Sequence, residues 1–259
     1  MTDYEHIELH IGPTFGRLTL NRPDRRNALS LALMREMLTA LDEVAASDAR
    51  ALVIEGSGSA FSAGHDLSEI VGERDEEFYA DLFGTCVTLM TRLHTIPQPV
   101  IAKVHGVATA AGCQLVAACD LAIASDDARF ATPGVNIGLF CSTPMVPVER
   151  NIGRKRALEM LFTGEMIDAP TAAAWGLVNR VVPRDDLEAA VVELVGRIAQ
   201  SSASVLALGK RAFYDQDGMV EGAAYDLACA VMIDNAQADD AQEGMRAFLE
   251  KRKPQWRKR

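Results

Sequence analysis

The stretch "TAAGCQLVAACD", residues 109–120, places small residues where a helix begins and follows them with Gln114 and an apolar run. The first N–H groups of a helix have no partner within the helix, and the helix dipole adds partial positive charge there. Because alanine and glycine have almost no side chain, a ligand can approach these N–H groups closely. The stretch therefore predicts a strand-to-helix turn that can bind a polarised oxygen.

A second turn of the same kind precedes this one in the chain. "ALVIEGSGSAFSAGHDL", residues 51–67, runs from a strand through Ala63-Gly64 into a helix, as "PVIAKVHGVATAAGCQL", residues 99–115, does through Ala111-Gly112. If the two turns converge, their N–H groups form an oxyanion hole, which stabilises charge that develops on a carbonyl oxygen. Tight packing between helix and strand also requires small residues, so composition alone leaves both interpretations open.

The hydrophobic pattern around these turns alternates between strands and helices. Strands are predicted at residues 7–12, 16–21, 51–58, 97–108, 120–125 and 177–183. Helices are predicted at residues 31–47 with Ser30 as cap, toward the end of 68–96, at 109–120, at 153–165, and at 168–176 between Asp168 and Gly176. From residue 184 the pattern is helical, with breaks near residues 201–202 and 218. We expect an α/β core over residues 1–200 and a C-terminal helical region over residues 201–259.

Composition and charge exclude several classes of protein. The 259 residues carry a formal net charge of −10, which argues against binding to nucleic acid or to anionic membranes. The longest apolar stretches are interrupted by polar residues, and "MTDYEHIELH" at the start lacks the apolar core of a secretory signal. We therefore expect a cytoplasmic protein. The five cysteines lack metal-ligand spacing and predict no metal site, and Cys113 and Cys119, which lie inside an apolar run, favour buried free thiols.

Several motifs together resemble those of the crotonase (enoyl-CoA hydratase/isomerase) superfamily. They are "NRPDRRNALS", "FSAGHDL", "PQPVIAKVHGVATAAGCQLVAACDLAIAS", "ARFATPGVNIGL", "ALEMLFTGEMIDAPTAAAWGLVNRVV" and "EGMRAFLEKRKPQW". The resemblance implies a spiral core of ββα units with a C-terminal helical oligomerisation region, assembled as a homotrimer or a dimer of trimers. It implies an acyl-CoA thioester as substrate, with coenzyme A as part of the substrate and no separate cofactor.

The resemblance also suggests which residues form the site. It places the oxyanion donors on the backbone N–H groups of Ala63 and Ala111. Arg25 and Arg26 are then suited to neutralise CoA phosphates, although solvated loop charges remain an alternative. The positions that line the CoA site in the family match Arg26, Ala28, Ala63, His65, Asp66, Leu67, Gly112 and Pro133.

The sequence departs from the family pattern at both catalytic glutamates. The family's hydratases use two glutamates to activate the water that adds across the double bond, and these positions are Gln114 and Gly134 here. A carboxylate can take a proton from water and return it, whereas an amide cannot, and glycine offers only space. His65, which can titrate near neutrality, is the strongest substitute, and Cys141 in a loop near the acyl group is another. Asp120 is interpreted as structural.

Three functions remain in view. The first is an enoyl-CoA hydratase-like lyase of fatty acid metabolism, in which Ala63 and Ala111 polarise a 2-enoyl-CoA thioester. The second is another enolate-forming reaction, a decarboxylation or isomerisation that uses His65 or Cys141; "FSAGHD" and the absent second glutamate resemble the methylmalonyl-CoA decarboxylase branch. The third is an acyl-CoA-binding protein without turnover. The sequence also resembles the enoyl-CoA hydratase domain-containing proteins, and we expect the first function.

Overall fold

The centre of the protein is a mostly parallel sheet, seen in a computed structural model that describes residues 3–257. Its strand order is β1-β2-β3-β4-β6-β9, in which β1 and β2 pair antiparallel and the other neighbours pair parallel. These strands are β1 (Ile7–Ile11), β2 (Gly16–Leu20), β3 (Leu52–Gly56), β4 (Val100–Val104), β6 (Leu121–Ser125) and β9 (Arg180–Val182). A second sheet, in the order β5-β7-β8, contains β5 (Val107–Thr109), β7 (Arg129–Ala131) and β8 (Ile167–Asp168).

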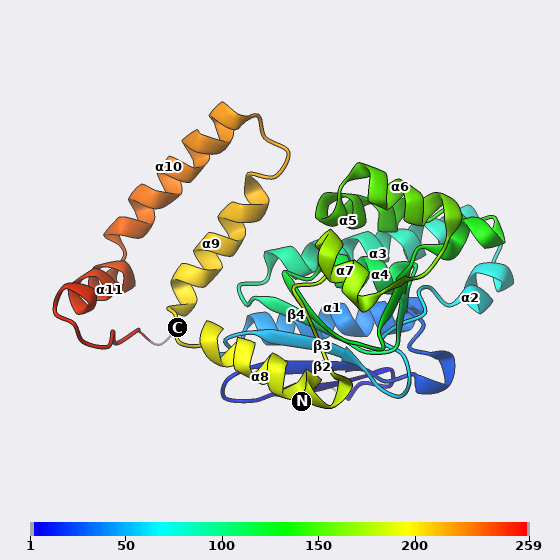
Figure 1. The fold of residues 1–259 in the computed structure, drawn as a ribbon, viewed down its shortest axis with the longest axis horizontal. Coiled ribbons are helices and arrows are strands. Elements are labelled where there is room, and N and C mark those ends of the chain that lie inside the picture. The colour runs from blue at the N-terminus through cyan, green and yellow to red at the C-terminus, as the bar shows by residue number, and fades with distance from the viewer. Residues whose placement is uncertain (1–2, 258–259) are drawn as a thin grey trace.

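Helices surround the large sheet, and the last ones extend away from it. The helices are α1 (Leu31–Ala45), α2 (Leu67–Gly72), α3 (Glu76–Thr95), α4 (Ala111–Ala118), α5 (Ser142–Ile152), α6 (Arg154–Thr163), α7 (Ala169–Trp175), α8 (Leu187–Ile198), α9 (Ala203–Asp215), α10 (Glu221–Gln237) and α11 (Asp239–Leu249). Short 3-10 helices lie at Pro23–Arg25, Pro133–Ile137 and Arg184–Asp186. In Figure 1, α9, α10 and α11 form an arm that projects to the left of the body. The mixed α/β class with helices at the C-terminal end is confirmed.

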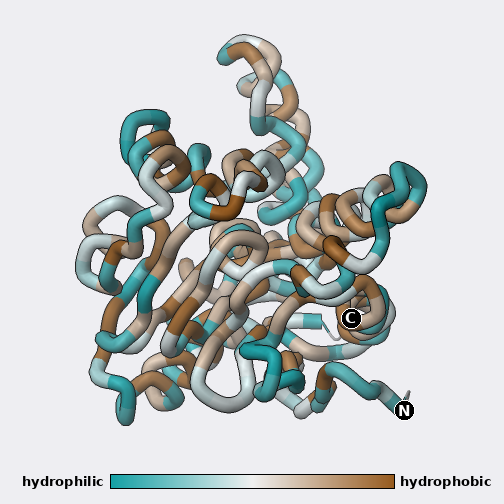
Figure 2. Tube along the Cα trace, turned by 90° about the vertical axis from the view of Figure 1, so that its right-hand side faces the viewer, coloured by the Kyte–Doolittle hydropathy of each residue, from teal (hydrophilic) through white to brown (hydrophobic). Residues whose placement is uncertain are grey.

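The large sheet is buried on both faces. Along β3, Leu52 and Ile54 join a core shared with α1, α3 and α4, whereas Val53 joins a smaller core beneath α8. Successive strand side chains point to opposite faces, so a sheet covered on both sides needs a continuous apolar run rather than alternation. In Figure 2 many hydrophobic segments run through the body of the trace, and hydrophilic segments are frequent at its periphery.

Several predicted boundaries are confirmed by the hydrogen bonds that create them. The Ser30 side chain accepts a hydrogen bond from the Leu33 N–H group and caps α1. Asp168 caps α7 in the same way, and Gly176 ends that helix in the left-handed conformation, with φ = 97°. These positions were predictable because the capping residues and the glycine act locally.

Three expectations about these elements were wrong. The single strand predicted over residues 97–108 is divided between β4 and β5, which belong to different sheets, because the chain turns at Gly106 with φ = 59°. The helix after Ala63-Gly64 begins only at Leu67. Residues 142–152 form α5, which was not predicted because two prolines, Pro144 and Pro147, weaken its helical pattern.

The C-terminal arm carries exposed apolar side chains. Large hydrophobic residues of α10 and α11 are open to solvent, among them Tyr225 at 70% and Phe248 at 83% exposure. The domain boundary near residue 200 and the trimeric or hexameric assembly remain predictions. Within residues 3–257 no single helix is long and apolar enough to span a membrane; α8 with its preceding turn and α9 pass such a test together but are bent by 101°.

Candidate active site

The first turn, residues 62–66, is fixed between two neighbouring segments of chain. Ser62 makes a parallel bridge with Ala108, and His65 makes one with Leu29. The Leu29 N–H group donates to the Gly64 carbonyl at 2.7 Å, and Gly64 adopts φ = 94°, which favours glycine. The turn is therefore held from both sides, and its N–H groups have fixed directions.

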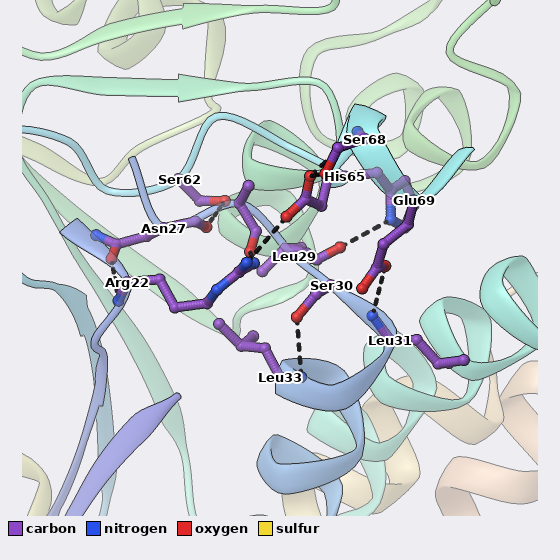
Figure 3. A network of polar contacts seen from close by, with 12 residues as sticks. Arg22, Asn27, Leu29, Ser30, Leu31, Leu33, Ser62, His65, Ser68 and Glu69 are labelled. Atoms are coloured by element: carbon purple, nitrogen blue, oxygen red, sulfur yellow. Dashed lines mark hydrogen bonds and ion pairs between the residues drawn. The ribbon is translucent and has the colours of Figure 1, made fainter. Parts of the chain in front are cut away.

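A buried polar network supports this turn from behind (Figure 3). One Arg22 guanidinium nitrogen donates to Asp66 Oδ2 at 2.9 Å, and another donates to the Ala28 carbonyl at 2.8 Å. Asn27 donates to the Ala60 carbonyl and accepts a bond from the Arg22 N–H group. Burial raises the pKa of Asp66, but hydrogen bonds from Ser68 and Arg22 outweigh it and hold the pKa below its ordinary value. The network thus keeps Asp66 ionised as the cap of α2.

The second turn comes into direct contact with the first. Ala110 lies at φ = 49°, and α4 begins at the next residue, Ala111. A Cβ atom at Gly112 would lie 2.3 Å from the Ser62 carbonyl oxygen, and one at Gly64 would lie 2.9 Å from the Thr109 carbonyl oxygen. Both separations are too short for a side chain. Glycine is required at both positions because the two turns pack against each other.

The backbone N–H groups of the two turns differ in whether they are free. The Ala63 N–H group donates to the Arg26 carbonyl at 3.0 Å, so the expectation that Ala63 supplies an oxyanion donor is wrong. The cause is that α2 begins four residues later, and Ala63 lies inside the loop network rather than at a helix start. Among the described residues, the N–H groups of His65 and Ala111 have no hydrogen-bond acceptor.

A cavity of about 540 Å³ opens beside these two N–H groups; we call it the first cavity. Six of the predicted residues line it: Ala63, His65, Leu67, Ala111, Pro133 and Cys141. Its other lining residues are mostly apolar, including Phe83, Ile137 and Phe140, and within residues 3–257 no Asp, Glu, Lys or Arg contributes to it. The ionisable side chains of the first cavity are therefore those of His65 and Cys141.

The His65 ring is held as a neutral imidazole. Burial lowers its pKa, and its Nδ1 atom lies 3.4 Å from the Leu29 carbonyl oxygen. The ring makes an edge contact with Phe83, at 5.5 Å between centroids. Because a carbonyl oxygen only accepts hydrogen bonds, Nδ1 carries the proton and Nε2 carries a lone pair. Nε2 is buried and has no partner within the described chain.

The sequence predicted open space at Gly134, the position of the family's second glutamate. The structure shows that this space is occupied by the protein itself. A Cβ atom at Gly134 would lie 2.0 Å from the Leu139 carbonyl oxygen and 2.8 Å from Cys141 Sγ. Burial raises the pKa of the Cys141 thiol, although a hydrogen bond from the Gly134 backbone opposes this. The loop over Gly134 therefore leaves no room for a longer side chain, and Cys141 is a protonated thiol.

Gln114 does not face the first cavity. Its side chain is buried, and its Oε1 atom accepts hydrogen bonds from Thr143 Oγ1 at 3.2 Å and Cys86 Sγ at 3.8 Å. It lines a neighbouring cavity of about 410 Å³, which we call the second cavity and which includes His94 and Tyr214. The expectation that Gln114 orients a water beside the thioester is therefore not supported by its position.

The remaining predicted residues lie around the first cavity rather than in its lining. Gly112 packs on Ser62, Asp66 caps α2, and Ala28 is buried behind the turn. The Arg26 side chain is exposed and has no hydrogen-bond or ion-pair partner within residues 3–257, so its role toward CoA phosphates stays a prediction.

Asp120 is structural, as predicted. It pairs with Lys210 at 2.6 Å and accepts hydrogen bonds from the Tyr214 hydroxyl and the Val100 N–H group. These contacts tie α9 to the body. Arg22 and Asn27 were missed by the sequence reasoning, and the run "NRPDRRNALS" gives no local signal that separates their buried side chains from the exposed arginines beside them.

Comparison with known proteins now decides the family. The family model described as Enoyl-CoA hydratase/isomerase matches residues 12–259. The chain belongs to the enoyl-CoA hydratase/isomerase family. It is 49% identical over 241 residues to enoyl-CoA hydratase domain-containing protein 3, mitochondrial, of Xenopus laevis, a match that covers 93% of this chain and 82% of that protein. The crotonase resemblance, including its domain-containing branch, is confirmed.

Solved structures of family members have the same fold. An enoyl-CoA hydratase from Mycobacterium smegmatis superposes with a TM-score of 0.95 at 46% identity, over 97% of this chain and 99% of that one. Human enoyl Coenzyme A hydratase domain-containing protein 3 gives 0.94 at 45% identity, over 97% and 100% of the two chains. The crotonase-like core with C-terminal helices is thereby confirmed.

The expected cytoplasmic location is contradicted by the relatives. Five of them, from Xenopus laevis, rat, mouse, human and zebrafish, are 46–49% identical to this chain and are named as mitochondrial proteins. These names point to the mitochondrion rather than the cytoplasm. The absence of a signal-like pattern in the first residues was therefore not a sound basis for the location.

Proposed function

We propose that this family member binds an acyl-CoA thioester in the first cavity and stabilises negative charge on the thioester oxygen with the N–H groups of His65 and Ala111. The observation that carries the proposal is the pair of unpaired N–H groups on two turns that pack against each other. Backbone N–H groups are strong hydrogen-bond donors, so two free ones beside one cavity are available to a ligand acceptor. Removing one donor of an oxyanion hole typically lowers the rate about 10²–10³-fold.

The lining of the first cavity favours enolate formation over hydration. Hydration needs a group that removes a proton from water, and no carboxylate is found in the described lining. Formation of an enolate does not require a group that activates water. A base removes the proton next to the thioester carbonyl, the C–H electron pair forms the new C=C bond, and the carbonyl π pair moves to oxygen. Loss of CO₂ from a 2-carboxyacyl thioester gives the same enolate without a base.

His65 is the base that this proposal requires for proton transfer. Its Nε2 lone pair has no partner within residues 3–257, and its depressed pKa keeps the ring neutral at pH 7. Its backbone N–H group would hold the enolate oxygen while its ring receives the proton. One residue would thus serve two functions through different atoms.

A deuterium-exchange experiment tests the proposal without knowledge of the natural substrate. The purified protein is incubated in D₂O with saturated acyl-CoAs, 2-carboxyacyl-CoAs and crotonyl-CoA, and the products are read by mass spectrometry. We expect deuterium at the carbon next to the thioester, or loss of CO₂, and no water addition to crotonyl-CoA beyond the buffer blank. His65→Ala should stop exchange and leave acyl-CoA binding intact, because the backbone N–H group remains.

A second candidate is acyl-CoA binding without turnover. The observation that favours it is that His65 Nε2 exposes almost no surface, so a substrate proton can reach it only after the ring moves. It predicts a higher thermal midpoint in the presence of acyl-CoA, by mass action, with neither exchange nor loss of CO₂. Rapid hydration of crotonyl-CoA would refute both candidates.

A further inference from the structure

The second cavity neighbours the first along α4 and α5. Its walls come from α3, α4, α5 and α9, and its volume is about 410 Å³. Thr143 lines both cavities, and Gln114, hydrogen-bonded to Thr143, lines only the second. Gln114 follows Ala111 by three residues, which is about 4.5 Å along a helix axis. The separation between the Ala111 N–H group and Gln114 along the helix axis is therefore within the length of a short acyl chain.

Gln114 turns its amide nitrogen toward the second cavity. Burial raises the pKa of the Cys86 thiol to about 12, and this protonated thiol donates to the Gln114 Oε1 atom at 3.8 Å. Thr143 donates to the same oxygen. The Nε2 atom, with two N–H donors, has no acceptor within the described part of the chain. Because Gln114 lines the second cavity, its amide N–H groups are available to a ligand acceptor there.

His94 supplies a hydrogen-bond acceptor that complements the N–H donors of Gln114. Its Nε2 atom lies 3.0 Å from the Ala118 carbonyl oxygen, which can only accept, so Nε2 carries the proton. Burial lowers the His94 pKa, and the ring is neutral with a lone pair on Nδ1, which has no partner within residues 3–257. The ring stacks on Tyr214 with centroids 3.9 Å apart and planes inclined by 8°. The second cavity therefore contains one free acceptor as well as free donors.

The charged groups of the second cavity are already neutralised. Asp120 is satisfied by Lys210 and Tyr214, and Arg150 pairs with Asp217 at 3.1 Å. The remaining walls include apolar side chains such as Met90 and Val146. An ionised ligand group would lack a free counter-charge here. A hydroxyl group fits, because it can accept from an amide N–H group and donate to an imidazole lone pair.

We propose that the second cavity receives the far part of the acyl chain and that Gln114 and His94 select chains with a hydroxyl group over plain alkyl chains. Gln114 is then a specificity-determining residue and takes no part in water activation. This inference rests on the proposed binding of the acyl-CoA thioester in the first cavity. It adds the class of acyl chain, a hydroxyacyl group whose hydroxyl lies beyond the reacting carbons.

Calorimetric titration with matched acyl-CoAs tests the inference. Acetyl-CoA, which has no chain to enter the second cavity, serves as the reference for the first cavity. Plain chains from butyryl to octanoyl are compared with chains of equal length that carry a hydroxyl at successive carbons. We expect one hydroxyl position to bind about tenfold more tightly than the plain chain, as one good hydrogen bond allows.

Two variants locate the preference. Gln114→Leu removes the amide at similar size, and His94→Phe keeps the ring stacked on Tyr214 but removes both nitrogens. Each should abolish most of the hydroxyl preference and leave acetyl-CoA affinity unchanged. Gln237→Leu, an exposed glutamine of α10, is the matched control and should retain the preference.

The outcomes separate this inference from the function on which it rests. If acetyl-CoA and the plain chains bind but no hydroxyl position improves affinity, this inference is overturned and the proposed function stands. Retention of the preference in Gln114→Leu and His94→Phe would also overturn it. If no acyl-CoA binds at all, the proposed function and the inference both fail.

Discussion

Replacing Ala111 by proline removes one N–H group from the first cavity at a position where a helix tolerates proline. Ala111 is the first residue of α4, and its N–H group has no partner within the described chain, so no internal hydrogen bond is lost. If this group is one of two oxyanion donors, its removal should cost about 2.7–4 kcal/mol of transition-state stabilisation. The exchange or decarboxylation rate should then fall about 10²–10³-fold.

The matched control is Ala203→Pro. Ala203 is the first residue of α9, its helix is capped by Ser202, and Ser202 has the extended backbone that suits a residue before proline. Ala110 has φ = 49°, so the thermal midpoint of Ala111→Pro is measured alongside the rate. We expect Ala203→Pro to retain both the wild-type rate and the wild-type midpoint.

A second readout is independent of turnover. An arylacryloyl-CoA absorbs at longer wavelength when its carbonyl is polarised, and this shift should be large in the wild-type complex and small with Ala111→Pro. The reasoning is refuted if folded Ala111→Pro binds the chromophore with the wild-type shift and catalyses at the wild-type rate.

Three further predictions concern stability. Gly134→Ala places a Cβ atom about 2 Å from the Leu139 oxygen and should lower the free energy of unfolding by about 1–3 kcal/mol in urea titration; an unchanged midpoint would contradict the packing described. Arg22→Met should cost about 1–3 kcal/mol at neutral pH, and the difference from wild type should shrink below about pH 4, because the depressed pKa of Asp66 gives stability only while its carboxylate is ionised. His65→Phe should reduce the loss of stability below about pH 6.5, since burial lowers the pKa of His65 and the unfolded chain binds the proton first; parallel pH profiles for wild type and variant would refute this.

Local chemistry explains which parts of the fold were predictable. Ser30, Asp168 and Gly176 each act within a few residues of a helix end, and their hydrogen bonds or backbone conformations follow from residue type. The division of residues 97–108 between two sheets was not predictable in this way. It depends on which strands pair with β5, and those pairings involve residues far away in the chain.

The site was predictable in its location but not in its donors. Small residues in both turns correctly indicated that backbone groups face a common space. The assignment of Ala63 failed because its N–H group is satisfied by the Arg26 carbonyl, a contact across the loop that spacing cannot reveal. The prediction of open space over Gly134 was wrong for a related reason, because the backbone of Leu139 occupies that space.

The packing of Gly64 and Gly112 against the opposite turns has a consequence for how new activities could evolve on this scaffold. Each glycine leaves room for the opposite turn, so an enlarged side chain at either position would displace both turns at once. A single substitution at either glycine is therefore expected to change the directions of the N–H groups in both turns together. Diversification is confined to surfaces that can change independently, namely the loop from Pro133 to Cys141 and the walls formed by α3 and α9. Mutant libraries built on those surfaces should yield altered ligand ranges while the two packed turns keep their conformation.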